Sequence, residues 1–297
     1  MTQPPIRVVG VAGAGQMGSG IAQVVAMAGY RTLLFDVSAA QLARAREGVA
    51  ASLAKLVEKG KATAEGREQA LARLDGVTDL AALHGADLVI EAAPEDLELK
   101  TGLWRALDPH CPHHTLFASN TSSLPIARMA AVTGRPDRVL GLHFFNPVPL
   151  MPLVEVVRTV ATGEAAFARA LAFARSLGKE VVAARDTPGF VVNRLLVPYL
   201  LDAVRAREAG LASTADLDAG MKLGAGHPMG PLALLDLIGL DTVVQVAEAM
   251  FTEFREPRFA PPPLLTRLVA LGHLGRKSGR GFYDYAGAAP VPAELGL

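Results

Sequence analysis

Asparagine is scarce in this sequence. Its 297 residues include only Asn120, Asn146 and Asn193. Each of the three lies in a segment that also carries other reactive or turn-forming residues: 119–123, 143–147 and 186–194. An asparagine amide donates and accepts hydrogen bonds without carrying charge, so it is hard to replace where a ligand must be oriented. These segments are therefore the first candidates for a functional site.

Cysteine, net charge and long apolar runs are also lacking. Cys111 is the only cysteine, which excludes an internal disulfide and indicates a reducing compartment. Lys plus Arg and Asp plus Glu both number 29, so no overall field attracts nucleic acid or an anionic membrane. The apolar run 6–12 contains Arg7 and is too short for a signal-peptide core or a membrane span. We therefore expect a cytoplasmic protein with no nucleic-acid or membrane partner.

Apolar strand-like runs alternate with helical patterns over the first part of the chain. The expected strands are 6–13, 31–35, 86–92, 115–119, 139–143, 153–157 and 180–183. A charged helical hairpin is expected over 38–74, and from Phe190 the pattern is helical, with a long apolar helix over 231–251 that breaks at Gly239. We predict an α/β class: a Rossmann-like doubly wound domain over 1–185 and an all-helical domain over 186–297. The apolar helices of the second domain predict a homodimer.

A glycine-rich turn lies between the first strand and the first helix. Gly13, Gly15 and Gly18 follow the strand, Gln16 and Met17 open the helix, and Asp36 ends the next strand. The glycines allow a tight turn, close approach of a pyrophosphate, and close packing of helix on strand. The helix N-terminus would hold the phosphates, and Asp36 would bind the adenine ribose and favour NAD over NADP. The alternative is a purely structural glycine turn.

His143 and Glu155 form the strongest catalytic pattern. Histidine is the usual general base for a hydroxyl that is being oxidised. Glu155 lies within the apolar run 153–157, where a buried carboxylate is costly unless it is paired. A lone histidine at a strand end is more often a packed core residue. The buried glutamate and the glycine turn in the same domain favour catalysis instead.

These motifs together resemble the L-3-hydroxyacyl-CoA dehydrogenase family, particularly the bacterial 3-hydroxybutyryl-CoA dehydrogenases. The resemblance covers nearly the whole chain and runs through 13–18, 95–100, 120–124, 143–149, 186–193, 223–231 and 277–283. It implies NAD-dependent oxidation of a short L-3-hydroxyacyl-CoA, as in fatty acid β-oxidation, by a dimer. One departure is His227, which stands where an aromatic residue is common and puts the acyl-chain preference in doubt.

The resemblance also implies catalytic roles. His143 would take the C3 hydroxyl proton while a hydride leaves C3 for the nicotinamide, and Glu155 would orient His143 and stabilise its charged form. Ser122 would bind the C3 oxygen beside the nicotinamide. Asn193 would support this array, and Asn146 would help to position the nicotinamide.

Further residues match cofactor and coenzyme A contacts in the family. Asn120, Glu95, Lys100 and Lys277 match the cofactor contacts. Ser52 and Lys59 match contacts to coenzyme A, and on a helix two residues seven positions apart share one face. For that pair, a solvated charged helix is an equally good interpretation.

Two alternatives to this function remain open, and one motif is misleading. The chain could be an NAD-dependent dehydrogenase of a free hydroxyacid or sugar acid, or a non-catalytic NAD-binding protein on the same fold. A specialised CoA-thioester pathway is a narrower variant of the main prediction. The segment 110–114 holds three histidines and a cysteine, but such close neighbours cannot all converge on one ion, so no metal is expected.

Overall fold

The structure is a computed structural model that describes residues 5–295, and the chain divides into two compact units. The first is Met1–Thr187 and the second is Pro188–Leu297. Each unit has its own hydrophobic core.

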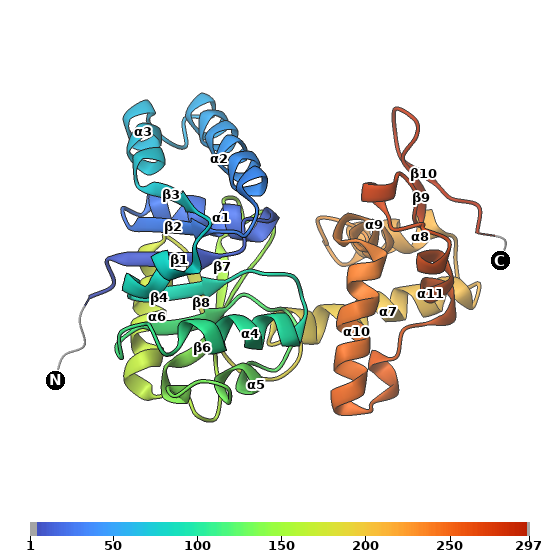
Figure 1. The fold of residues 1–297 in the computed structure, drawn as a ribbon. Coiled ribbons are helices and arrows are strands. Elements are labelled where there is room, and N and C mark those ends of the chain that lie inside the picture. The colour runs from blue at the N-terminus through green and yellow to red at the C-terminus, as the bar shows by residue number, and fades with distance from the viewer. Residues whose placement is uncertain (1–4, 296–297) are drawn as a thin grey trace. The chain divides into compact units, whose positions relative to one another are not determined.

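The first unit is built on an eight-stranded sheet in the order β3-β2-β1-β4-β5-β6-β7-β8 (Figure 1). The strands are β1 Val8–Ala12, β2 Arg31–Phe35, β3 Leu74–Val77, β4 Leu88–Glu91, β5 Leu116–Ser119, β6 Val139–Phe144, β7 Leu153–Arg158 and β8 Glu180–Arg185. Neighbouring strands pair in parallel except β6 and β7, which are antiparallel. The strand order reverses at β1, which lies between β2 and β4, as in doubly wound folds. The predicted α/β fold class is confirmed.

Helices connect the strands of this unit. They are α1 Gln16–Met27, α2 Ala39–Glu58, α3 Ala64–Ala72, α4 Leu97–Leu107, α5 Ile126–Ala130 and α6 Glu164–Ser176. The predicted hairpin is present as α2 and α3, which pack on each other close to β3 (Figure 1). Ser38 and Thr63 begin these two helices, because each side chain accepts a hydrogen bond from a backbone N–H of the first turn. Strand β3 was not predicted, since its residues Leu-Asp-Gly-Val show no apolar alternation.

Alternate residues of the strands face different layers of this unit. Leu116 and Ala118 of β5 belong to the core cluster that includes α1 and α6 residues, whereas Phe117 stacks on Trp104 of α4, with ring centroids 4.7 Å apart. The period of two along a strand explains this division, because successive side chains point to opposite faces. The sheet therefore has an α1/α6 face and an α4/α5 face.

The same alternation decides where the candidate catalytic residues point. Leu142 of β6 and Val154 of β7 belong to the cluster on the α1/α6 face, so their neighbours His143 and Glu155 point to the other face. That face is covered closely, since a Cβ atom added at Gly141 would lie 2.5 Å from Ile126 of α5.

The second unit is mainly helical. Its elements are α7 Val192–Glu208, α8 Thr214–Ala219, α9 Pro231–Ile238, α10 Leu240–Phe254, α11 Pro263–Ala270, β9 Tyr283–Asp284 and β10 Val291–Pro292. The predicted break at Gly239 is confirmed: this residue has φ 104° and separates α9 from α10. The prediction of no further strands was wrong in detail, because the two-residue β9 and β10 pair antiparallel, too short to give a periodic signal. Over residues 5–295, no helix combines the length and apolarity that crossing a membrane requires.

Candidate active site

The glycine turn after β1 meets the chain after β4, at the point where the strand order reverses. Gly13 has φ 111°, and a Cβ atom there would lie 2.5 Å from the carbonyl oxygen of Ala92. A Cβ atom at Gly18 would lie 1.7 Å from the carbonyl oxygen of Gly13, so both positions require glycine. A Cβ atom at Gly15 would meet no heavy atom within 4 Å, which leaves its backbone open to a ligand.

Helix α1 begins at this turn without a polar cap. Gly15 is the N-cap residue, it provides no side-chain hydrogen bond, and the first turn holds no acidic residue. The positive end of the helix dipole and the first backbone N–H groups therefore remain available to an anion. These features fit the pyrophosphate of a dinucleotide, as the sequence predicted.

Asp36, directly after β2, is hydrogen-bonded to the glycine turn. Its Oδ2 accepts a hydrogen bond from the backbone N–H of Ala14 at 2.9 Å, and its Oδ1 accepts one from Ser38 at 2.9 Å. Each carboxylate oxygen has a second lone pair, so Asp36 can hold the turn and still accept from a ribose hydroxyl.

His143 and Glu155 are direct cross-strand neighbours on β6 and β7. The His143 Nδ1 atom lies 2.7 Å from Glu155 Oε2, and the residues are 4% and 0% exposed. A carboxylate accepts from Nδ1–H, and this fixes the tautomer in which the other ring nitrogen, Nε2, can accept a proton. Antiparallel pairing at one register position thus produces the arrangement that the sequence predicted.

Ser122 lies at the other side of the imidazole. Its Oγ atom is 3.0 Å from His143 Nε2, in the turn that follows β5. Asn120 connects this turn to β6, because its Oδ1 accepts a hydrogen bond from the backbone N–H of Phe144 at 2.9 Å. The ends of β5, β6 and β7 therefore bring Ser122, His143 and Glu155 into one hydrogen-bonded row that can hold a hydroxyl and move its proton.

The carboxylate of Glu95 accepts hydrogen bonds from the turn that contains Ser122. Glu95 Oε1 accepts hydrogen bonds from Thr121 Oγ1 at 2.6 Å and from the backbone N–H of Ser122 at 3.1 Å. Burial by itself would raise the pKa of Glu95, but the Lys100 charge and the hydrogen bonds of this turn lower that pKa below its usual value. Glu95 is therefore ionised at neutral pH.

Lys100 on α4 joins Glu95 to a carboxylate that the sequence interpretation missed. Its Nζ atom lies 2.6 Å from Glu91 Oε1 and 3.3 Å from Glu95 Oε2. Glu91 is the last residue of β4, is 0% exposed, and accepts a hydrogen bond from Ser119 Oγ at 2.5 Å. Burial raises the pKa of Glu91 in spite of the Lys100 charge and these hydrogen bonds. The signal was available, since Glu91 ends an apolar run just as Glu155 lies within one.

Comparison with known proteins shows the family of this chain. Residues 8–187 match the NAD binding domain of 3-hydroxyacyl-CoA dehydrogenase, and residues 189–285 match the C-terminal domain of the same enzymes. The chain belongs to the 3-hydroxyacyl-CoA dehydrogenase family. The resemblance stated from the motifs is thereby confirmed, and so is NAD as the cofactor of the family's first domain.

Relatives cover nearly the full length of this family member. A 3-hydroxybutyryl-CoA dehydrogenase of Mycobacterium tuberculosis is 53% identical over 282 residues, which are 94% of this chain and 99% of that protein. The mitochondrial hydroxyacyl-coenzyme A dehydrogenase of Mus musculus is 48% identical over 287 residues, which are 94% of this chain and 91% of that protein. The crystal structure of (S)-3-hydroxybutyryl-CoA dehydrogenase from Ralstonia eutropha superposes with a TM-score of 0.92 at 46% identity, covering 95% of this chain and 100% of the other.

Other residues that the family resemblance singles out belong to other elements of the chain. Asn146 is exposed in the loop after β6. Ser52 is half-buried on α2, and Lys59 is exposed directly after that helix ends. Asn193, in the first turn of α7, and Lys277, in the 3-10 segment 276–278, belong to the second unit.

Lys277 and His227 each have a partner within that second unit. The Nζ atom of Lys277 lies 2.6 Å from the Asp241 carboxylate, in a half-exposed ion pair. His227 Nδ1 lies 3.1 Å from the hydroxyl of Tyr199. Any cofactor contact of Lys277 therefore competes with Asp241.

The histidine-rich segment 110–114 lies at the opposite, amino end of the parallel strands. His110 stacks on His84 with ring centroids 4.7 Å apart, and His114 Nε2 lies 3.0 Å from Asp87. Burial raises the pKa of the Cys111 thiol to about 11, so it is not a reactive thiolate at neutral pH. In the part of the chain that the structure describes, no three His, Cys, Asp or Glu side chains are grouped to hold a metal ion.

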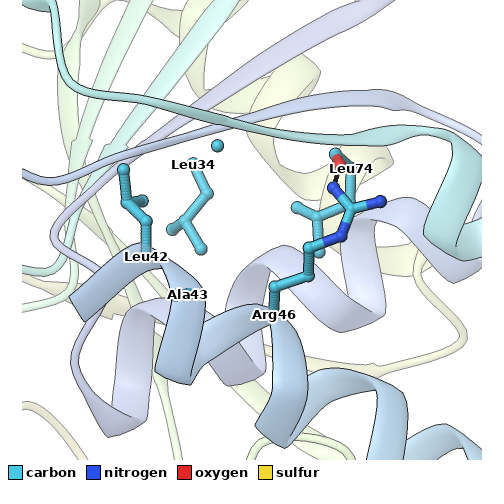
Figure 2. Close-up of a pocket in the computed structure, with 6 residues that line it drawn as sticks. Leu34, Leu42, Ala43, Arg46 and Leu74 are labelled. Carbon is cyan, nitrogen blue, oxygen red and sulfur yellow. Dashed lines mark hydrogen bonds between the residues drawn. The ribbon is translucent and has the colours of Figure 1, made fainter. Parts of the chain in front are cut away.

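A separate cavity of about 190 Å³ lies between α2 and the β2–β3 edge. Figure 2 shows its leucine lining, with Arg46 reaching over it to the backbone carbonyl of Leu74, 3.2 Å from Nη1. Arg46 is the only titratable side chain in that lining, and it already has a partner. The cavity therefore offers no catalytic groups.

Proposed function

We propose that this chain is an NAD-dependent L-3-hydroxyacyl-CoA dehydrogenase of short acyl chains, acting on substrates such as 3-hydroxybutyryl-CoA. The observation that carries the proposal is the hydrogen-bonded row Ser122–His143–Glu155, in the same domain as a glycine turn that fits a dinucleotide. The names of the relatives support the acyl-CoA substrate.

The geometry suits removal of a hydroxyl proton. Glu155 accepts from Nδ1–H of His143, which favours the tautomer in which Nε2 accepts the proton of the C3 hydroxyl. Ser122, 3.0 Å from Nε2, holds the same oxygen with a neutral hydroxyl. The bound NAD supplies the acceptor for the hydride from C3. After the proton and the hydride have left, the product is the 3-oxoacyl-CoA.

Several further roles rest on the resemblance and remain predictions. Asn193 would support the catalytic array and Lys277 would contact the cofactor. Asn146 would help to position the nicotinamide. Ser52 and Lys59 would contact coenzyme A; Ser52 lies on α2 and Lys59 caps its end, and an extended ligand along this helix could meet both.

We also propose a cytoplasmic homodimer that assembles through the helical domain and works in fatty acid β-oxidation. Large apolar side chains of the second unit support the dimer: Leu195, Leu211, Leu223 and Leu237 are 68%, 74%, 85% and 50% exposed in the single chain. Light scattering on the purified protein tests this. A mass near one 31.1 kDa chain would exclude the dimer.

The test of the function is NADH consumption with acetoacetyl-CoA, beside free acetoacetate and with NADPH as the alternative donor. We expect rapid turnover with the thioester and NADH, and little with either substitute. Equal turnover with free acetoacetate would indicate a hydroxyacid dehydrogenase and remove the roles of Ser52 and Lys59. Binding of NADH without turnover of any 3-oxo compound would indicate a non-catalytic member of the fold.

A further inference from the structure

The loop 146–152, which connects β6 to β7, is rich in proline. Three of its seven residues are prolines, which carry no backbone N–H and have a fixed φ. Within the loop, the carbonyl oxygen of Pro147 accepts hydrogen bonds from the backbone N–H groups of Leu150 and Met151 at 2.9 and 3.0 Å. The loop is therefore a stiff turn, and a partner that holds one part of it also limits where the other parts lie.

Lys179, directly before β8, donates hydrogen bonds to this loop. Its Nζ atom lies 2.7 Å from the carbonyl oxygens of both Val148 and Met151. Hydrogen bonds from a charged donor are stronger than those between neutral groups. Burial lowers the pKa of Lys179, and the two carbonyl oxygens offset this cost of placing an ammonium there. Lys179 therefore fixes the middle of the loop to the start of β8.

The loop also packs on α1, the helix that begins at the glycine turn. Val148 is 2% exposed and belongs to the core cluster that includes α1 residues. A Cβ atom added at Gly20 of α1 would lie only 3.0 Å from the Cβ atom of Val148. Val148 thus contacts α1 through its side chain and Lys179 through its carbonyl oxygen, so the loop is held on both.

The loop begins close to the candidate catalytic base. His143 lies in β6, and the ring of Phe145 packs edge-on against the imidazole, with ring centroids 4.7 Å apart. Asn146 follows, and in the proposed function its amide helps to position the nicotinamide. Because the Asn146 side chain is exposed, the backbone of the loop decides where this amide lies.

We propose that Lys179 is a positioning residue, which holds the loop 146–152 on α1 so that the Asn146 amide meets the nicotinamide end of the bound cofactor. Lys179 then acts on the reaction through the loop and touches neither cofactor nor substrate. The consequence for NADH binding and turnover rests on the proposed function, in which Asn146 positions the nicotinamide. The consequence for the loop itself does not.

Lys179→Met tests this, because it removes the donors and keeps a side chain of similar length. Four quantities are measured: hydrogen exchange of the Leu150 and Met151 amides without cofactor, the Kd of NADH by fluorescence, the Kd of ADP-ribose, which lacks the nicotinamide, and kcat at saturating NADH. We expect faster exchange at both amides and a kcat about tenfold lower, because small misplacements of groups that orient a reactant are costly. The Kd of NADH should be about three- to tenfold weaker, and the Kd of ADP-ribose should stay within about twofold of wild type.

Lys179→Arg is the conservative variant. A guanidinium carries several N–H groups and can again donate to two carbonyl oxygens. We expect the exchange of both loop amides and kcat to return close to wild type. An arginine variant with wild-type exchange but the kcat of Lys179→Met would overturn the connection between the loop and the nicotinamide.

Arg169→Met is the matched control. Arg169 on α6 is another half-buried cation whose pKa is lowered by burial, and its Nη1 donates to the carbonyl oxygen of His114 at 2.8 Å, at the amino end of the strands. We expect a loss of stability without a change in kcat or in exchange at Leu150 and Met151. An equal loss of kcat in the two methionine variants would assign the effect to general destabilisation and overturn the proposal.

Three results with Lys179→Met would overturn it directly. One is unchanged exchange of the two loop amides, and another is faster exchange with a wild-type kcat and a wild-type Kd of NADH. The third is a Kd of ADP-ribose weakened as much as that of NADH, because the effect would then lie outside the nicotinamide. Exchange and both Kd values need no substrate, so wild-type protein inactive on the thioester would refute the proposed function and leave these tests standing.

Lys179→Gln provides a milder variant if Lys179→Met does not fold. It removes the charge and keeps a neutral donor, whose hydrogen bonds are weaker. We expect the same pattern with smaller amplitude: faster exchange at Leu150 and Met151, a lower kcat and an unchanged Kd of ADP-ribose. Unchanged exchange and unchanged kcat would refute the hold of Lys179 on the loop.

Discussion

The two ends of the parallel sheet both hold buried charged side chains, but these side chains bond to different partners. At the carboxyl end, Glu95 and Lys100 lead through the Ser122 turn to His143. At the amino end, Arg135 donates to Asp108 and to the backbone carbonyl of Cys111. The contacts at the carboxyl end lead to a nitrogen of His143 that can exchange a proton. The contacts at the amino end lead to a main-chain carbonyl.

Strand direction explains the difference. In an open α/β sheet the loops after the carboxyl ends of the strands surround the crevice where ligands bind. Charged groups at the amino end lie away from that crevice, and their hydrogen bonds hold the loops that enter the strands. Asp87 shows this, because it accepts hydrogen bonds from the backbone N–H groups of Arg7 and Val8 at the start of β1. A histidine cluster such as 110–114 is therefore not a functional site by composition alone.

The largest expected effect comes from the carboxyl end. His143→Gln keeps a hydrogen bond toward Glu155 but removes the base, so we expect kcat about 10²- to 10⁴-fold lower with the Kd of NADH nearly unchanged. Steady-state kinetics with acetoacetyl-CoA and a fluorescence titration with NADH measure the two quantities. Near-normal turnover would show that His143 is not the catalytic base.

A smaller effect on the enzyme is expected from a substitution at Asp36, which holds the glycine turn at the same end of the sheet. Asp36→Ala should reduce the preference for NADH over NADPH by about tenfold, equivalent to about 1.4 kcal/mol, since the carboxylate no longer repels a 2′-phosphate. The KM for NADH should rise as well, because Asp36 also holds the backbone of Ala14. Asp36→Asn is the control that keeps one acceptor. An unchanged NADH/NADPH ratio in both variants would mean that another group recognises the ribose.

The sequence predicted those parts of the carboxyl end that depend on local pattern. The glycine turn is a continuous motif. The pairing of His143 with Glu155 followed from the cost of burying a carboxylate in an apolar strand. The structure added the reason for their contact, which is one antiparallel register position between β6 and β7.

Other parts could not be predicted from local pattern. Strand β3 has four residues, of which Asp75 and Gly76 are poor strand formers, so only its pairing with β2 reveals it. The Glu91–Lys100 contact joins a strand end to a helix across nine residues, and no periodicity connects the two positions. The family motif singled out Lys100, and the partners of its side chain depend on how α4 packs on the sheet.

A substitution at the amino end of the sheet should lower the stability of the fold and leave kcat unchanged. Asp108→Asn leaves the Arg135 guanidinium, 6% exposed, with a neutral partner, so we expect a loss of about 1–3 kcal/mol in the free energy of unfolding. Urea denaturation measures this, and kcat should be that of the wild type. A kcat several-fold below wild type with unchanged stability would contradict the division between the two ends.

The smallest expected effect is a pH dependence at Asp87. Burial by itself would raise its pKa, but hydrogen bonds from Val8 and Arg7 and the contact with His114 lower the pKa below the usual 3.8. A carboxyl whose folded pKa is lowered stabilises the fold above its unfolded pKa, and this contribution is lost as the pH falls through the folded value. Asp87→Asn should therefore be less stable than wild type at pH 7, and the difference in the free energy of unfolding should shrink toward about pH 3. Urea denaturation of both proteins at the two pH values measures it. A difference independent of pH would mean that Asp87 acts through its shape and hydrogen bonds alone, whereas a change in kcat at pH 7 would connect the amino end to the reaction.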